Sequence, residues 1–169
     1  MGLSDFLFEL MVKLLMAILL RGKTVCTLCG KPIVENQEAV GFPPFVSNEL
    51  DPLQIFSDGA FHASCFWGHP LAMQAEARDV ESREKNPPLT RECWVCRRTI
   101  DNPDEYLGLG HLTDDARESI HALNYAQFHR ACLPGWTDRG KMCALLEEFM
   151  NSGKWKGPKL AQILTELCN

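Results

Sequence analysis

The stretch "CWVCRRTI" at residues 93–100 holds two cysteines separated by two residues and followed by two arginines. Cysteines at this spacing are typical of a knuckle in which both thiolates bind one zinc ion. A tetrahedral site needs two more ligands, and "FHRACL" at 128–133 supplies a histidine and a cysteine three residues apart. The pattern predicts a Cys3His zinc site made of Cys93, Cys96, His129 and Cys132.

The same pattern occurs a second time, 67 residues earlier in the chain. A gap-free alignment of the two segments also matches apolar positions, such as Ile33 with Ile100 and Phe61 with Phe128. Self-similarity that includes the apolar positions is the signature of a repeated structural unit. The sequence therefore predicts a second zinc site made of Cys26, Cys29, His62 and Cys65.

Each ligand-bearing segment is about the size at which an apolar core alone seldom maintains a fold, so we expect zinc to be a condition of folding. The predicted class is α+β, with two tandem zinc units and with flanking and linking α-helices. The expected organisation is an apolar N-terminal helix (1–25), zinc unit 1 (26–68), a linker helix with a Pro-rich turn (69–92), zinc unit 2 (93–135) and a C-terminal helical pair (136–169).

Local patterns add detail to this organisation. Two extended runs around an Asn-containing turn, in "CGKPIVENQEAVGF" at 29–42, predict a local hairpin. The polar run at 71–86 predicts a helix by propensity, and the periodic apolar residues after 139 predict two more. Each His-x2-Cys pair suits the first turn of a helix, because positions i and i+3 lie on one face.

The N-terminal stretch "LSDFLFELMVKLLMAILLRGK" at 3–23 is the most apolar part of the chain. Its uninterrupted apolar run, 14–20, is much shorter than the roughly 20 residues that span a bilayer. It also lacks the basic start and the cleavage site of a signal peptide. Three roles stay open: packing across the zinc units, docking or self-association, and attachment to a membrane surface.

The charge balance bears on the class of partner. The net charge is −5, and residues 26–68 contain five acidic side chains against one lysine. Nucleic-acid binding requires concentrated Lys and Arg, so it is disfavoured, although it remains an alternative. A hydrolytic zinc site keeps one open coordination position, whereas each set here has four protein ligands. A thiol redox role for the Cys-x2-Cys pairs is a further alternative.

The segments "CTLCGKPIVENQEAVGF…GAFHASCF" and "CWVCRRTIDNPDEYLGL…AQFHRACL" resemble treble-clef zinc fingers, and in particular the first zinc module of LIM domains. The resemblance implies structural zinc at the eight ligands and a role in protein interaction. A LIM domain carries a second ligand set directly after its first. This chain has none there, so it resembles the module and not a complete LIM domain.

Two of the eight cysteines, Cys143 and Cys168, fall outside the ligand pattern and lie at apolar helix positions, which predicts buried thiols.

Without a secretory signal, we expect a reducing cytoplasmic location. The sequence thus predicts a non-enzymatic protein with two Zn²⁺ ions that acts as an adaptor or inhibitor. Its partner is expected to be another protein, bound through the N-terminal helix or an acidic face of a zinc unit.

Overall fold

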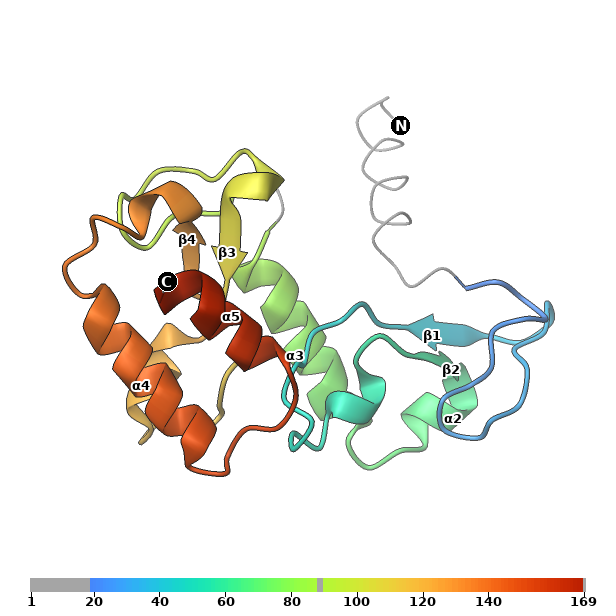
Figure 1. Ribbon diagram of the computed structural model, residues 1–169. Coiled ribbons are helices and arrows are strands. Elements are labelled where there is room, and N and C mark those ends of the chain that lie inside the picture. Colours follow the sequence, from blue (N-terminus) through green and yellow to red (C-terminus); the bar gives the residue numbers. More distant parts are fainter. Residues whose placement is uncertain (1–18, 88–89, 169) are drawn as a thin grey trace. The chain divides into compact units, whose positions relative to one another are not determined.

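The computed structural model describes residues 19–87 and 90–168 (Figure 1). Two compact units share this part of the chain: unit 1 contains 19–45 and Ile55–Asp79, and unit 2 contains Val46–Gln54 and the residues from Val80 onward. Both combine short strands with helices, as the predicted class requires. Most of the helix predicted over 1–25 lies outside the described residues. Within them, no helix has the length and apolar character needed to cross a membrane.

Unit 1 is built on a two-stranded antiparallel sheet. Strand β1 (Ala39–Gly41) pairs with β2 (Ala60–His62), and helix α2 (Ala63–Trp67) begins where β2 ends. The hairpin predicted within 29–42 is therefore wrong. The backbone before β1 pairs instead with the preceding segment, where the N–H of Ile33 donates to the carbonyl of Thr24 at 2.9 Å.

A cluster of phenylalanines forms the core of unit 1. Five of them are buried: Phe42, Phe45, Phe56, Phe61 and Phe66. The rings meet at tilted or edge-on angles, with Phe42 and Phe66 at 5.0 Å between centroids and Phe56 and Phe66 at 5.6 Å. Buried aromatic rings in such arrangements contribute large apolar areas and about 0.5–1.5 kcal/mol per pair beyond burial.

Unit 2 contains the second two-stranded sheet, in which β3 (Tyr106–Gly108) pairs antiparallel with β4 (Gln127–His129). Short 3-10 turns complete the loops of the molecule: Gln54–Phe56, Pro103–Glu105, Ser119–Leu123 and Arg130–Cys132. The last of these follows β4 directly, in the place that helix α2 takes after β2.

Three longer helices occupy the stretches where the sequence predicts them: α3 (Ala72–Lys85), α4 (Arg139–Asn151) and α5 (Lys159–Cys168). The buried side chains of α5 have the i, i+3, i+4, i+7 spacing of an amphipathic helix and pack on α4 in the core of unit 2: Leu160, Ile163, Leu164 and Leu167. At the end of α3, the amide of Gln127 donates to the carbonyl of Lys85 at 2.7 Å and satisfies a terminal helix acceptor.

The segment 46–54 belongs to unit 2, although its place in the sequence puts it inside the predicted zinc unit 1. Asn48 explains the difference. Its side chain donates to the carbonyl of Lys154 at 2.9 Å and accepts from the N–H of Lys156 at 3.0 Å. The Glu49 N–H also donates to the Lys156 carbonyl, so the segment is hydrogen-bonded to the loop between α4 and α5.

The prediction of two buried thiols in the C-terminal helices is wrong. Cys143 on α4 and Cys168 at the end of α5 form a disulfide, with their Cα atoms 6.0 Å apart. Both residues lie on the apolar faces that meet between the helices, so the packing of α5 on α4 brings their sulfurs together. The six remaining cysteines are free, and all six belong to the predicted ligand sets.

Candidate metal centres

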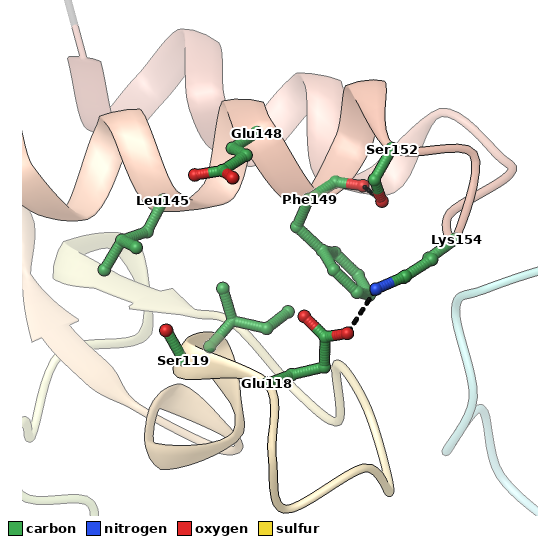
Figure 2. A pocket seen from close by; sticks show the side chains of 8 residues that line it. Glu118, Ser119, Leu145, Glu148, Phe149, Ser152 and Lys154 are labelled. Atoms are coloured by element: carbon green, nitrogen blue, oxygen red, sulfur yellow. Dashed lines mark hydrogen bonds and ion pairs between the residues drawn. The ribbon is translucent and has the colours of Figure 1, made fainter.

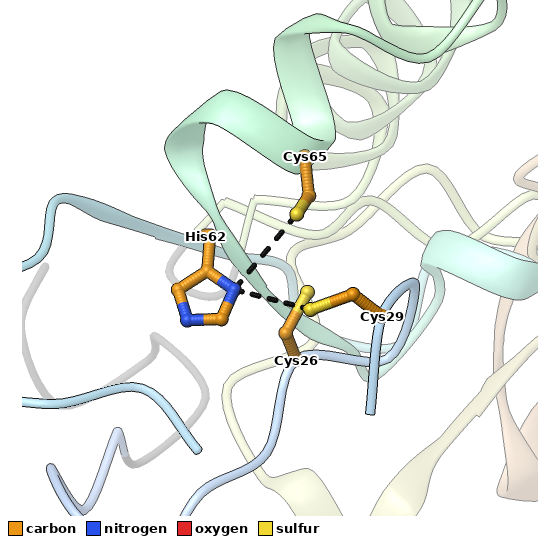
Figure 3. A group of neighbouring side chains, drawn as sticks. All are labelled: Cys26, Cys29, His62 and Cys65. Carbon is orange, nitrogen blue, oxygen red and sulfur yellow. Dashed lines mark hydrogen bonds between the residues drawn. The ribbon is translucent and has the colours of Figure 1, made fainter. Parts of the chain in front are cut away.

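The four predicted ligands of unit 1 come together in one cluster, called site 1 (Figure 3). Cys26 and Cys29 lie on the knuckle before β1, His62 ends β2, and Cys65 lies on α2. In Figure 3 the three sulfurs gather around Nδ1 of the histidine. One donor atom from each residue lies within 4.8 Å of the others, so the cluster is positioned to bind one metal ion.

Unit 2 brings the second predicted set together as site 2. Cys93 and Cys96 lie on its knuckle, His129 ends β4, and Cys132 lies in the following 3-10 turn. These four donor atoms also lie within 4.8 Å of one another.

The donor distances suit zinc. Bonds of about 2.3 Å to sulfur and about 2.0 Å to nitrogen place these atoms about 3.5 Å apart in a tetrahedron. Nδ1 of His62 lies 3.4 Å from Sγ of Cys29 and 3.8 Å from Sγ of Cys65. At site 2, Nδ1 of His129 lies 3.4 Å from Sγ of Cys96. Three thiolates and an imidazole at these separations are the donor set of a closed structural zinc site.

The same backbone turn shapes both knuckles. At site 1 the Cys26 N–H donates to the Lys31 carbonyl at 2.9 Å, and the Gly30 N–H donates to the Cys26 carbonyl at 2.8 Å. Their counterparts 67 residues later, Cys93 to Arg98 and Arg97 to Cys93, both measure 2.9 Å. The residue after the second cysteine has positive φ in each unit, 69° at Gly30 and 57° at Arg97.

A further hydrogen bond ties each knuckle to the strand that carries the histidine. The N–H of Thr27 donates to the Ala60 carbonyl on β2 at 2.9 Å, and that of Trp94 donates to the Gln127 carbonyl on β4 at 2.7 Å. Since the histidine lies two residues further along each strand, this bond sets the cysteine pair beside it. The ligand geometry therefore follows from the backbone.

The environment of His62 fixes which ring nitrogen faces the sulfurs. Its Nε2 lies 3.2 Å from the carbonyl of Pro32, which can only accept. Nε2 therefore carries the proton and Nδ1 is left as the metal donor, the arrangement that outer hydrogen bonds usually impose on metal-binding histidines. At site 2 the backbone N–H of His129 donates to Sγ of Cys93 at 3.3 Å, which stabilises a thiolate there.

Without a metal, the thiols within each site differ in pKa. Burial raises the pKa of Cys26, but backbone N–H donors led by that of His62 outweigh it and lower the pKa to about 6. The backbone N–H of Arg98 is the main cause that lowers the pKa of Cys96 to about 6. Burial and the neighbouring thiolates raise the pKa of Cys132 to about 11. The same causes raise the pKa of Cys65. One thiol in each site therefore keeps its proton until a cation displaces it.

A cavity of about 450 Å³ adjoins site 1 and is lined by three of its ligands. Polar residues complete its wall, among them Lys31, Gln37, Glu38 and Ser64, and the sequence did not predict them as part of a site. No spacing rule identifies them, because they become neighbours only when β1 pairs with β2.

A second cavity of about 110 Å³ lies in unit 2 between α4 and the 3-10 turn Ser119–Leu123 (Figure 2). An ion pair between Lys154 and Glu118 crosses it, and Glu148 lies on its α4 side. The hydroxyl of Ser152 donates to the Phe149 carbonyl at the end of α4. Its lining contains no histidine or cysteine, so the metal-binding chemistry of the described residues lies in the two Cys3His clusters.

Comparison with known proteins gives no relative to which the chain can be assigned. No family model, no curated protein and no solved structure matches the chain. The class that can be stated is therefore a mixed helix and small-sheet protein with two Cys3His clusters suited to zinc.

Proposed function

We propose that this chain is a zinc-dependent protein-interaction module, in which two treble-clef-like units similar to the first zinc module of LIM domains are held by structural Zn²⁺. The observation that carries the proposal is the pair of Cys3His clusters with all four donors in place. In small units, structural zinc supplies on the order of 10–16 kcal/mol of apparent binding free energy. That amount is enough to decide whether such a unit folds.

Four protein donors at each site favour a structural over a catalytic ion. A catalytic zinc generally has three protein ligands and binds water or substrate in the fourth position. His62 and Cys65 are held by β2 and α2, and the knuckle cysteines by backbone hydrogen bonds, so the fourth donor is built into the fold. The proposed role of the metal is therefore to stabilise a binding surface.

The surface that supports a protein partner is an apolar patch at the knuckle of unit 1. It consists of Leu20, Val25 and Val34, whose exposed fractions are 56%, 52% and 46%. Gly22, which lies between the first two, donates to the carbonyl of Ile33 next to the third, so the three side chains belong to one short backbone region. Exposed apolar groups on one short backbone region are candidates for an interaction site.

The charge of unit 1 suggests the chemistry of the partner. Glu35 and Glu38 lie on the loop that follows Val34, and Arg21, Lys23 and Lys31 lie near Leu20 and Val25 in the sequence, so the described part of unit 1 has five acidic and four basic side chains. A protein surface with apolar side chains bordered by charges of both signs would match both the patch and its mixed charge. A phosphate backbone needs concentrated Lys and Arg on the protein and would not match this surface, so nucleic acid remains the weaker alternative.

The N-terminal stretch is proposed as an extension of this surface, for docking or self-association. Its connection to unit 1 is well anchored, because the Arg21 guanidinium donates to three carbonyls of the 34–37 turn: Val34, Glu35 and Gln37. The six free cysteines must stay reduced to bind zinc, so we propose an intracellular setting for this function, in which the Cys143–Cys168 disulfide lies in the α4–α5 interface apart from the zinc ligands.

Two measurements test the proposal in sequence. Native mass spectrometry of the purified chain should show two zinc ions, and chelation should remove the ions and the folded charge-state distribution together. Affinity capture should then be repeated with Leu20→Glu, Val25→Glu and Val34→Glu combined. A partner that uses the patch is lost from this variant. The same partner is retained by Leu50→Glu, a control at an equally exposed leucine in unit 2.

Two results would count against the proposal. If the chain folds without zinc, the part of the proposal that assigns a structural role to the metal is wrong. A partner whose capture is unaffected by the triple substitution places the interaction elsewhere, and an electrophoretic shift of RNA or DNA that weakens steeply with salt would favour the nucleic-acid alternative.

A further inference from the structure

The two metal sites differ in the exposure of their knuckle cysteines. All six ligand cysteines lie in the described part of the chain, and of these Cys29 alone is exposed. The cavity of about 450 Å³ beside site 1 is lined by Cys29, His62 and Cys65, so small solutes can reach two of its thiolates from one side. The corresponding knuckle cysteine of site 2, Cys96, is only partly exposed.

The residues within and just after each knuckle also differ in size. Unit 1 has Thr27 between its cysteines and Gly30 after them, whereas unit 2 has Trp94 and Arg97 at the same positions. The Arg97 guanidinium lies 5.4 Å from the centroid of the Trp94 ring and pairs with Glu92 at 3.7 Å. At site 2 the Arg98 side chain interacts with the sulfur of Cys96, whereas its counterpart in unit 1, Lys31, lines the open cavity together with Cys29. An added Cβ at Gly30 would meet no atom within 4 Å, which shows the space left open there.

We propose that Cys29 is a site of oxidative modification, at which hydroperoxides act on site 1 and release its zinc while site 2 keeps its ion. The proposal rests on the zinc binding proposed above and adds a second property to it. Susceptibility of a cysteine to oxidation follows its thiolate character and its exposure. Metal binding keeps the ligand cysteines as thiolates at both sites, and at site 1 the fold also exposes one of them, Cys29.

The reaction has two steps, and hydrogen peroxide is the oxidant. The Cys29 thiolate attacks one peroxide oxygen, so an S–O bond forms, the O–O bond breaks and hydroxide leaves, which gives a sulfenic acid. The Cys65 thiolate then attacks that sulfur, so an S–S bond forms, the S–O bond breaks and a second hydroxide leaves. The two sulfurs together give up two electrons, and these reduce the peroxide to two hydroxide ions.

Cys65 is the expected second sulfur because it lines the same cavity and its Sγ lies within 4.8 Å of the other donors. Cys26 is fully buried beneath the knuckle. Formation of the disulfide removes two of the four zinc ligands, and the ion leaves. A thiol reductant reverses the step and allows zinc to bind again.

The experiment uses the full chain loaded with two zinc ions. Hydrogen peroxide is added in small excess, zinc release is followed with a chromophoric indicator, and the oxidised cysteines are located by peptide mass mapping. One zinc per chain should be released about tenfold faster than the other, because exposure sets the rate of attack. The early product should carry a Cys29–Cys65 disulfide.

The two knuckles offer matched exchanges as controls. Thr27→Trp combined with Gly30→Arg gives unit 1 the knuckle side chains of unit 2 and should slow the fast release. Trp94→Thr combined with Arg97→Gly makes the opposite change and should speed release from site 2. Arginine can adopt the left-handed backbone of this position at a modest cost in strain, as Arg97 itself does at φ 57°.

Alkylation of the unmodified holo-protein with iodoacetamide gives a test that does not depend on any variant. Cys29 should be labelled first among the six free cysteines. Equal rates of zinc release, earlier release from site 2, or labelling that begins at Cys96 or Cys132 would each overturn the proposal. A chain that holds no zinc at the start would instead contradict the proposed function, so the two failures are distinguishable.

Discussion

Unit 1 and unit 2 hold their ligands with the same backbone hydrogen bonds but surround them with different cores. In unit 1 the core consists mainly of the five buried phenylalanines next to the zinc ligands. In unit 2 the core continues away from the site into α4 and α5, where Leu146 and Leu160 are fully buried and a disulfide joins the helices. The local metal geometry is therefore compatible with very different amounts of supporting structure.

This difference indicates how far each unit depends on its metal. The core of unit 1 combines very short strands with the five buried phenylalanines, so we expect loss of the ion to disorder it. The α4–α5 pair of unit 2 keeps its own apolar interface and its covalent link when site 2 is lost. We therefore expect the same ligand substitution to have unequal consequences in the two units.

The largest expected effect comes from removal of one buried thiolate in each unit. Cys26→Ser should unfold unit 1, because structural zinc is worth on the order of 10 kcal/mol, comparable to the whole stability of a small domain. Cys93→Ser should disorder the knuckle and β3–β4 while α4 and α5 stay helical. Backbone amide correlation spectra distinguish these results, and well-dispersed signals from unit 1 in the Cys26→Ser protein would contradict the account.

Loss of the disulfide should have a smaller effect, confined to unit 2. Cys143→Ser combined with Cys168→Ser reopens a loop of 25 residues and should lower the free energy of unfolding by about 3 kcal/mol. Urea denaturation measures the change, and both zinc ions should remain bound. A reductant should destabilise the wild-type chain and leave the variant unaffected. Recovery of both thiols in reduced form from cells would indicate a reducing compartment.

The pH dependence of zinc binding should be set at each site by one thiol with a raised pKa, Cys65 at site 1 and Cys132 at site 2. At site 2 the Cys132 thiol has a pKa raised to about 11, so between pH 6 and pH 11 zinc must displace its proton. Affinity should rise about tenfold per pH unit in this range, or about 1.4 kcal/mol, and more steeply near neutral pH, because the raised pKa of His129 means that its ring must lose a proton there as well. Below pH 6 the Cys96 thiolate is protonated as well, and affinity should fall more steeply.

Calorimetric titration in two buffers of different ionisation enthalpy measures the protons released by zinc. Release of one proton or more per site at pH 7 supports the assignment of the ligands. Binding without proton release would mean that the third thiol of each site is not a ligand.

The smallest expected effect comes from the turn after each knuckle. Gly30→Ala places a side chain at φ 69° with nothing to contact within 4 Å, so it should cost about 1 kcal/mol through backbone strain alone. Gly140→Ala is the matched control, because it also meets no atom but lies in α4, where alanine should stabilise by up to about 1 kcal/mol. Thermal unfolding of both variants should give shifts of opposite sign.

The sequence was sufficient to predict the two ligand clusters and the three long helices. A Cys-x2-Cys and His-x2-Cys pattern constrains chemistry directly, and its second occurrence placed all eight ligands, from Cys26 to Cys132, in two groups that the structure brings together. The helices α3, α4 and α5 were predictable because propensity and apolar periodicity are strong over ten residues or more.

The features that were missed depend on contacts between distant residues. Strands of three residues carry almost no periodic signal, so nothing local indicated that Ala39–Gly41 pairs with Ala60–His62. The assignment of 46–54 to unit 2 depends on hydrogen bonds of Asn48 to residues more than 100 positions away. The disulfide required the crossing of α4 and α5 to be known, because two cysteines on apolar stripes are otherwise indistinguishable from buried thiols.

X-ray absorption at the zinc edge, on the purified full chain with its metal content determined, tests the central claim most directly. The account predicts two zinc ions per chain, each with three sulfur neighbours at about 2.3 Å and one nitrogen neighbour at about 2.0 Å. A shell with oxygen neighbours, or with fewer than three sulfurs per zinc, would contradict the claim that both sites are closed and structural. It would instead favour a catalytic ion.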